Sequence, residues 1–283
     1  MDFQKITTDD QSLEKCARLF AICFPKANHL NADYLRWMYR DNPRGQVVGF
    51  NAIDKDEYVG HYACLPCEIM LDGRPQKSLL AILSTTHPDY QGQGLFPRLA
   101  ERTYAEYDHE KFACVYGVGN ANSTPSLVRK IGFQLVSPLE VKVGFGASKI
   151  DWSTVTTNSQ FRRIWNYEDL QWRAANKVNP VTIARNSYGD TVLNADSINS
   201  MIKVMSPVLV EGETPKDLPR ESVLPKLSMG FFPKGAARLP FYLPLPDALK
   251  PSPLNMVYKP LHTDISQLNP QALMFGFQDF DAY

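Results

Sequence analysis

The sequence lacks the features that would direct it to a membrane or to a nucleic acid. No apolar run reaches the roughly 18 residues that a membrane-spanning helix needs. The first residues, Met1 to Lys5, do not have the pattern of a signal peptide. The chain has no excess charge, because 30 Lys and Arg residues balance 30 Asp and Glu residues. We therefore expect a cytoplasmic protein that binds neither nucleic acid nor membranes and acts on small molecules.

Cysteine is scarce, and its spacing does not indicate a metal centre. The five cysteines are an odd number, which is typical of a reducing compartment rather than of a disulfide framework. Cys64 and Cys67 have the spacing of a redox motif or of half a zinc site, but no second Cys/His pair lies at ligand spacing. We interpret both as structural residues and expect no metal ion.

What the sequence does contain is enough apolar residues for a sizeable core. Its 283 residues, 44% of them hydrophobic, are long for one small domain and comfortable for two. Apolar residues recur at helical spacing over residues 12–24, and Asn31 is placed to cap a second helix. Runs rich in β-formers then predict strands over residues 47–53, 58–71 and 76–86. This order indicates an α/β fold with a mixed sheet.

The next segment places a strand, a glycine-rich turn and a helix in succession. Pro88 ends the strand, and Pro97 fits only within the first turn of a helix that runs to about residue 107. Gly92 and Gly94 let the backbone approach a ligand closely, and the exposed amides of the helix start favour an anion. The turn has neither the dinucleotide fingerprint nor the Gly-Lys-Ser/Thr of a P-loop. It predicts a phosphate-binding site of another type.

The run Gln91-Gly92-Gln93-Gly94-Leu95-Phe96, preceded by His87-Pro88, resembles the acetyl-CoA loop of the GNAT superfamily of N-acyltransferases. The family pattern is Arg/Gln-x-x-Gly-x-Gly/Ala, and this sequence departs from it where Phe96 replaces a small residue. The resemblance implies a GNAT fold in the N-terminal half. It also implies acetyl-CoA or another acyl-CoA as co-substrate, and direct attack of an amine on the thioester.

By the same resemblance, the cofactor is bound mainly through backbone groups. The end of the strand would pair with pantetheine and the acyl oxygen, the glycine loop would hold the pyrophosphate, and an asparagine after the next strand would hold the pantetheine arm. The cofactor-binding residues predicted in this way are Leu83, Ser84, Thr85, Thr86, Gln91, Gly92, Gln93, Gly94, Leu95, Phe96, and Asn120 or Asn122.

The catalytic acid of the family is missing from its usual position. The next strand is predicted over residues 112–118, and a short helix over residues 126–131 ends at Gly132-Phe133, as in the family. The family tyrosine that protonates the departing thiolate is replaced here by Val128. The acid is therefore another group or solvent.

Four residues are candidates for the catalytic base or acid, and three of them have a non-catalytic alternative. His87 has a suitable ordinary pKa but stands before a proline in a turn. Glu68, like His61, lies on the strand before the hairpin and faces either the substrate cleft or solvent. Tyr116, near the expected entry of the amine, is either the acid or a core aromatic residue. The carboxylate of Tyr283 is the fourth candidate, since some tandem GNAT relatives use their C-terminal carboxylate.

A short motif of the first half recurs in the second half, and we call this recurrence the echo. The runs Leu35-Arg36-Trp37 and Asn42-Pro43 are matched by Leu170-Gln171-Trp172 and Asn179-Pro180, with two extra residues between. Either duplication of a GNAT-like half or chance recurrence of a short motif explains the echo, and we favour duplication. Residues 1–145 would then form the acyl-CoA-binding domain, and residues 146–283 a degenerate copy without the cofactor loop.

The rest of the second half is rich in proline but also in apolar residues. For residues 207–260 we expect ordered loops and edge strands laid over a core rather than a disordered linker. The aromatic segment 275–283 is expected to be strand-like and held against the protein.

The predicted function is acetyl-CoA-dependent N-acylation of a small-molecule amine. The glycine loop, the Trp-containing helix and the aromatic terminus together look like bacterial GNAT proteins of surface-polysaccharide synthesis, so we favour an amino-sugar nucleotide as acceptor. A non-catalytic CoA-binding or scaffold protein is the alternative, because the family tyrosine and strand glutamate are missing. Aminoacyl transfer from charged tRNA is a third possibility, which the zero net charge disfavours.

Overall fold

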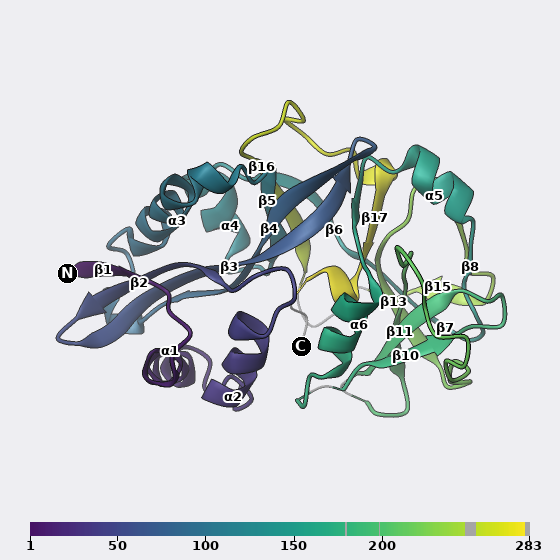
Figure 1. The fold of residues 1–283 in the computed structure, drawn as a ribbon, viewed down its shortest axis with the longest axis horizontal. Helices are drawn as coiled ribbons and strands as arrows, with labels where there is room; N and C mark the ends of the chain where they lie inside the picture. The colour runs from purple at the N-terminus through teal and green to yellow at the C-terminus, as the bar shows by residue number, and fades with distance from the viewer. Residues whose placement is uncertain (179, 198, 247–252, 281–283) are drawn as a thin grey trace.

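The computed structural model describes residues 1–178, 180–197, 199–246 and 253–280. Within these residues, a 15-stranded mixed sheet runs through both halves of the chain (Figure 1). The predicted α/β class with a mixed sheet is confirmed.

The N-terminal half alternates helices with the longest strands of the sheet. Its strands are β1 (Asp2–Lys5), β2 (Val48–Asp54), β3 (Glu57–Leu71), β4 (Arg74–Thr86), β5 (Cys114–Gly119), β6 (Gln134–Pro138) and β7 (Glu140–Gly144). Its helical segments are α1 (Asp10–Cys23), α2 (Ala32–Leu35), η1 (Arg36–Arg40), η2 (Pro88–Tyr90), α3 (Leu95–Glu106), η3 (Asp108–Glu110), α4 (Thr124–Ser126) and η4 (Leu127–Ile131).

The C-terminal half consists mainly of short strands. These are β8 (Lys149–Ile150), β9 (Phe161–Arg163), β10 (Thr182–Arg185), β11 (Thr191–Asp196), β12 (Lys203–Pro207), β13 (Lys226–Phe231), β14 (Ala237–Arg238), β15 (Tyr242–Pro244), β16 (Asn255–Pro260) and β17 (Leu273–Gly276). Its helical segments are α5 (Trp152–Asn158), α6 (Tyr167–Ala174), η6 (Pro270–Ala272) and η7 (Phe277–Asp279).

Local signals position the first helices. Asp9 caps α1 by accepting a hydrogen bond from the Ser12 amide, and the buried face of the helix carries Leu13, Cys16 and Phe20. Asn31 caps α2 in the same way, as predicted. α1 and α2 cover one face of the sheet, and α3 with α4 covers the other (Figure 1). The sheet is therefore buried on both faces around β3, β4 and β5.

The two halves exchange one strand each. β16, from the C-terminal half, lies between β5 and β6, and β7, from the N-terminal half, lies between β13 and β15. The expectation of edge strands over residues 207–260 is therefore wrong for β13 and β16, which are interior strands. Met256, Val257 and Tyr258 are consecutive buried residues, the pattern of a strand covered on both faces.

The exchange gives both halves the same strand pairing. The order β2-β3-β4-β5-β16-β6 in the first half corresponds to β10-β11-β12-β13-β7-β15 in the second. In both series, the third and fourth strands are parallel and every other neighbouring pair is antiparallel.

The aromatic terminus is strand-like only at its beginning. β17 ends at Gly276, and the turn η7 follows because the Asp279 carboxylate accepts a hydrogen bond from the Gly276 amide at 2.6 Å. β17 lies between β13 and β9 and so joins the sheets of the two halves. The final three residues lie outside the described part of the chain.

Candidate active site

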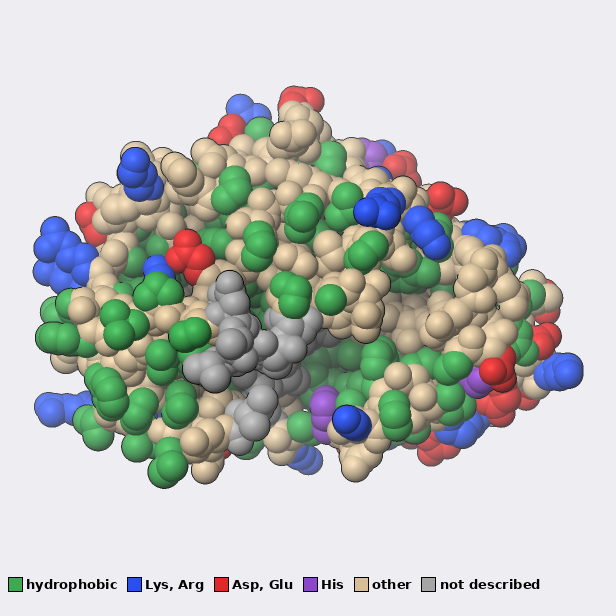
Figure 2. Space-filling model, turned by 180° about the vertical axis from the view of Figure 1, so that it is seen from behind, with side chains coloured by type: hydrophobic (Ala, Val, Ile, Leu, Met, Phe, Trp, Pro, Cys, Tyr) green, Lys and Arg blue, Asp and Glu red, His purple; other side chains and the backbone are tan. Residues whose placement is uncertain are grey.

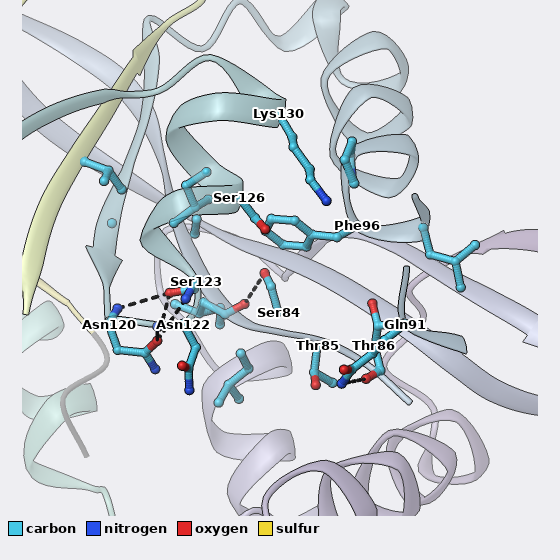
Figure 3. A pocket seen from close by; sticks show the side chains of 18 of the residues that line it. Ser84, Thr85, Thr86, Gln91, Phe96, Asn120, Asn122, Ser123, Ser126 and Lys130 are labelled. Atoms are coloured by element: carbon cyan, nitrogen blue, oxygen red, sulfur yellow. Dashed lines mark hydrogen bonds between the residues drawn. The ribbon is translucent and has the colours of Figure 1, made fainter. Parts of the chain in front are cut away.

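β4 and β5 pair over two residues and then separate, and a pocket opens where they part. Their parallel ladder joins Leu79 to Val115 and Leu80 to Tyr116. Beyond it, a cavity of about 550 Å³ lies between the two strands, the glycine-rich loop and η4 (Figure 3). Every predicted cofactor-binding residue lines this cavity except Gln93. The structure thus brings together the strand end, the loop and the asparagines that the sequence singled out.

A β-bulge turns the end of β4 toward the pocket. The register of the β3–β4 hairpin shifts between His61 and Ala63, so that Leu83 and Ser84 together lie opposite Tyr62. Leu83 has a left-handed backbone with φ 40°, a conformation that costs a bulky residue about 1–3 kcal/mol. Past Leu80, the β5-facing edge of β4 has no strand partner among the described residues. Its backbone groups are therefore available to a ligand.

α3 begins beside the pocket at two left-handed glycines. Gly94 is its N-cap residue with φ 71°, and Gly92 has φ 78°. Their positive φ angles favour glycine at both positions. A Cβ added at either position would meet nothing within 4 Å, so the space beside the start of the helix is open. The amides of the first turn have no partner within the helix, and the helix dipole adds to their attraction for an anion.

Two side-chain hydrogen bonds hold the loop in place. The Gln91 amide donates to the Thr86 carbonyl at 3.3 Å (Figure 3). The Tyr90 hydroxyl donates to Asp54 Oδ2 at 2.6 Å, and this bond raises the pKa of Tyr90. The loop is thereby anchored to the ends of β4 and β2.

Asn120 and Asn122 follow β5 on the opposite side of the pocket and play different parts. Asn120 Oδ1 accepts the backbone N–H of Asn122 at 2.9 Å and that of Ser123 at 3.0 Å, so it holds the turn (Figure 3). The Asn122 side chain makes no hydrogen bond to another described residue. Of the two asparagines, Asn122 therefore has the side chain available to a ligand.

Residues 4–136 match the model of a family described as the acetyltransferase (GNAT) domain. These residues form a GNAT acetyltransferase domain. A search of curated protein sequences found no significant match.

Two solved structures share the fold across both halves of the chain. A probable N-acyltransferase from Enterococcus faecalis V583, a conserved protein of unknown function, is 13% identical with a TM-score of 0.55, over 93% of this chain and 73% of its own. A GCN5-related N-acetyltransferase from Kribbella flavida is 11% identical with a TM-score of 0.58, over 92% of this chain and 72% of its own. At this identity the likeness shows the fold alone.

Within the GNAT domain, Tyr116 lies in the core rather than at the pocket. Its ring packs edge-on against Phe161 and Phe275, with centroids 5.0 and 6.2 Å away, and its hydroxyl is 3.5 Å from Cys67 Sγ. Burial raises the pKa of Tyr116 well above its ordinary value. Tyr116 is therefore a core aromatic residue, and it does not line the pocket.

Glu68 and His87 are also absent from the residues that line the pocket. Glu68 belongs to the far end of β3 and forms an ion pair of 2.6 Å with Arg44. His87 caps η2, where its Nδ1 accepts the Asp89 amide at 3.2 Å. Tyr283 lies outside the described residues. The structure therefore does not bring Tyr116, Glu68 and His87 together at the pocket.

The fold adds lining residues that sequence reasoning missed. Phe24 comes from the end of α1, Val257 from the exchanged strand β16, and Ser126 and Lys130 from the short helix after β5. Lys130 is the sole charged residue among the described lining residues. Its place in the short helix between the asparagines and Gly132 is a signal that could have pointed to it, because that helix follows directly on the predicted cofactor-binding asparagines. Phe24 and Val257 depend on long-range packing.

The lining offers amides and hydroxyls rather than carboxylates. No Asp, Glu or His occurs among the described residues around the pocket. Throughout the described part of the chain, no cluster of three or more His, Cys, Asp and Glu residues is arranged to hold a metal ion. No helix in the described ranges is long and apolar enough to cross a membrane.

The corresponding place in the second half is filled by protein. β12 and β13 also pair in parallel, from Lys203 with Lys226 to Met205 with Ser228. β13 then continues beside β17, and Gly276 approaches β12 so closely that a Cβ there would lie 2.2 Å from Ser206 Oγ. The strand separation that forms the pocket of the GNAT domain thus holds the segment β17–η7 in the second half.

Proposed function

We propose that this chain transfers an acetyl group from acetyl-CoA to the amine of a small molecule. The observation that carries the proposal is the pocket at the separation of β4 and β5, bounded by the left-handed glycine loop at the start of α3. An extended thiol arm fits between separated strands whose edges are unpaired, and a pyrophosphate fits the free amides of a helix start. The family match of residues 4–136 supports the same chemistry.

In this proposal, backbone groups bind the cofactor and polarise its thioester. The amides from Gly92 to Phe96 bind the pyrophosphate, and the free edge of β4 from Leu83 to Thr86 pairs with the pantetheine arm. A backbone N–H at the bulge polarises the thioester carbonyl. The amine nitrogen attacks the carbonyl carbon, the C–S bond breaks, and the thiolate takes up the proton that the amine gives up. Holding both substrates in contact supplies much of the rate enhancement.

The acceptor that we favour is an amino-sugar nucleotide, by analogy with polysaccharide-associated proteins of this fold. On the face seen in Figure 2, acidic and basic side chains are interspersed around the rim rather than gathered by sign. Such a surface favours a small acceptor over a polyanion such as tRNA.

We also propose that the two halves arose by duplication, with residues 1–145 as the acyl-CoA-binding domain and residues 146–283 as the degenerate copy. The shared strand pairing supports this proposal. The segment β17–η7 at the separation of β12 and β13 supports cofactor binding by the first half alone.

A CoA-binding protein without turnover is the second candidate function. It is favoured by the lining itself, since no described lining residue is an Asp, Glu or His that would accept a proton from the amine. Release of free thiol from acetyl-CoA in the presence of a panel of amines separates the two functions. Sustained thiol release requires an enzyme, whereas calorimetric binding of CoA without release supports the binding protein.

Gly94→Trp tests the assignment of the pocket. The indole would enter the open space beside the start of α3, and we expect CoA binding to fall below detection by calorimetry. Gly73→Trp is the matched control, because Gly73 in the β3–β4 turn also has a left-handed backbone, φ 74°, with nothing within 4 Å of an added Cβ. If Gly94→Trp binds CoA as tightly as Gly73→Trp, the loop is not the cofactor site.

A further inference from the structure

Phe96 and Lys130 share one wall of the pocket, apart from the backbone groups assigned above. Phe96 comes from the first turn of α3 and Lys130 from η4. Both line the cavity, and Figure 3 shows the Lys130 side chain extending from η4 toward the Phe96 ring. An aromatic ring and a cation therefore meet at the same side of the cavity.

Lys130 is a cation without a carboxylate partner in the described structure. Its side chain is exposed, and no hydrogen bond or ion pair joins it to another described residue. Because it is the sole charge among the described lining residues, it gives this side of the pocket a positive potential that favours an anionic group. Its neighbour Arg129 is also exposed but does not line the pocket.

Phe96 is held in position by aromatic packing. Its half-buried ring meets Tyr62 edge-on, with centroids 5.5 Å apart and planes at 68°. Tyr62 is buried, and its hydroxyl is hydrogen-bonded to that of Tyr104. The part of the Phe96 ring that borders the pocket is therefore a fixed apolar surface, on which a purine base can stack.

We propose that Phe96 and Lys130 bind the 3′-phosphorylated adenosine of the cofactor, with Phe96 contacting the adenine and Lys130 the 3′-phosphate. The inference rests on the proposed function, since CoA carries a purine and a separate phosphate monoester beyond its pyrophosphate. With the pyrophosphate on the amides at the start of α3, the adenosine lies next to the side chain of that same turn, Phe96. The residue that departs from the family pattern thereby contributes a side-chain contact to cofactor affinity.

Calorimetric titration with CoA and with 3′-dephospho-CoA tests the role of Lys130. We expect the wild-type protein to bind CoA about 5- to 10-fold more tightly than 3′-dephospho-CoA, the size expected for one partly exposed charge-assisted contact. Lys130→Gln should bind both compounds with equal affinity. Arg129→Gln removes the same charge from the next position and should keep the preference.

The other outcomes contradict the role of Lys130, the whole subsite or the proposed function. If Lys130→Gln keeps the wild-type preference, or if Arg129→Gln loses it to the same extent, Lys130 does not bind the 3′-phosphate. If the wild-type protein binds CoA without any preference, the subsite fails while the proposed function stands. If the wild-type protein binds neither compound, the proposed function fails as well.

Phe96→Leu tests the aromatic half of the subsite. Leucine keeps the apolar contact with the core but removes the flat ring. We expect a loss of about 5-fold or more in affinity for both compounds, the lower range for one base–aromatic stack, while the ratio between them stays as in the wild type. Unchanged affinity for CoA would remove Phe96 from the subsite.

Discussion

The indole ring of Trp37 stacks on that of Trp172, with centroids 5.1 Å apart and planes at 20°. The indole N–H of Trp37 donates to the Trp172 carbonyl at 2.8 Å, and that of Trp172 donates to the Trp37 carbonyl at 3.0 Å. A reciprocal contact of this kind is the pattern of an interface between two like subunits. Since both residues occupy the same place in the echoed motif, the contact supports the proposed duplication.

This pair should be energetically coupled. Trp37→Ala and Trp172→Ala should each lower the free energy of unfolding by about 3 kcal/mol. The double variant should lose less than the sum by about 1–2 kcal/mol, because the second substitution removes a contact that is already gone. Urea denaturation of the four proteins measures this coupling. Trp152 in α5, whose indole bonds Asp190 at 2.7 Å, supplies the control pair, since Trp152→Ala should add independently to Trp37→Ala.

A buried ion pair also joins the halves. Arg44 donates from Nε and Nη2 to both carboxylate oxygens of Asp169, at 2.8 and 2.7 Å, and the Asp169 side chain is 2% exposed. Arg44→Ala should lower the free energy of unfolding by about 3–5 kcal/mol, because it leaves the Asp169 charge buried without its counterion. Thermal and urea unfolding measure the loss.

The control for this pair is an arginine on the surface. Arg40 contacts Asp41 at 3.2 Å with both side chains substantially exposed, so Arg40→Ala should cost less than about 1 kcal/mol. Equal losses for Arg40→Ala and Arg44→Ala would contradict the assignment of a buried ion pair that holds the halves together.

His61 should make the protein less stable in mild acid. Burial lowers the pKa of its imidazole from 6.5 to about 3, and the neutral ring satisfies its bonds by donating to Asn51 Oδ1 and accepting from the Tyr39 hydroxyl. Below about pH 6.5 the imidazole is protonated in the unfolded chain but stays neutral in the native protein. The free energy of unfolding therefore decreases as the pH is lowered. The expected contribution is a loss of about 2 kcal/mol between pH 7 and pH 5.

The contribution of His61 is isolated by comparing how the free energy of unfolding changes with pH in the wild type and in histidine variants. His61→Gln should lower stability at pH 7 but lose about 2 kcal/mol less than the wild type on going to pH 5. His109→Gln, at an exposed position, should keep the wild-type slope. A wild-type slope in His61→Gln would mean that His61 is not the group responsible.

The strand exchange predicts how fragments behave. A fragment of residues 1–145 lacks β16, which separates β5 from β6, and a fragment of residues 146–283 lacks β7. Neither fragment alone should show a cooperative unfolding transition, whereas coexpressed fragments should elute together on gel filtration. A soluble, cooperatively unfolding fragment 1–145 would show that β16 is dispensable.

Local signals made much of the GNAT domain predictable. The cap Asn31 and the left-handed Gly92 and Gly94 depend only on residues within about one turn of them, so they could be predicted from the sequence. The cap Asp9 is missed, because the predicted helix begins at residue 12. The apolar run of β16 indicates a covered strand, but its place between β5 and β6 is set by contacts with strands more than a hundred residues earlier in the chain.

The candidate catalytic residues illustrate the same difference between local and long-range information. Tyr116 lies on the correct strand, but which face of the sheet it occupies depends on a ladder of two residue pairs with β4. Val115 and Tyr116 point to opposite faces, and the sequence alone does not say which face borders the core. His87 is a polar side chain whose Nδ1 caps its own turn.

The position of β16 also bears on how the protein is made. During synthesis on the ribosome, the strands of the N-terminal half emerge before β16. The sheet around the cofactor pocket cannot close until Asn255 has been made and can pair with Gly119. Until then β5 and β6 present unpaired edges to other chains. The pocket that gives the protein its proposed activity is thus assembled only after residues 255–260 have been translated, more than a hundred residues after β5.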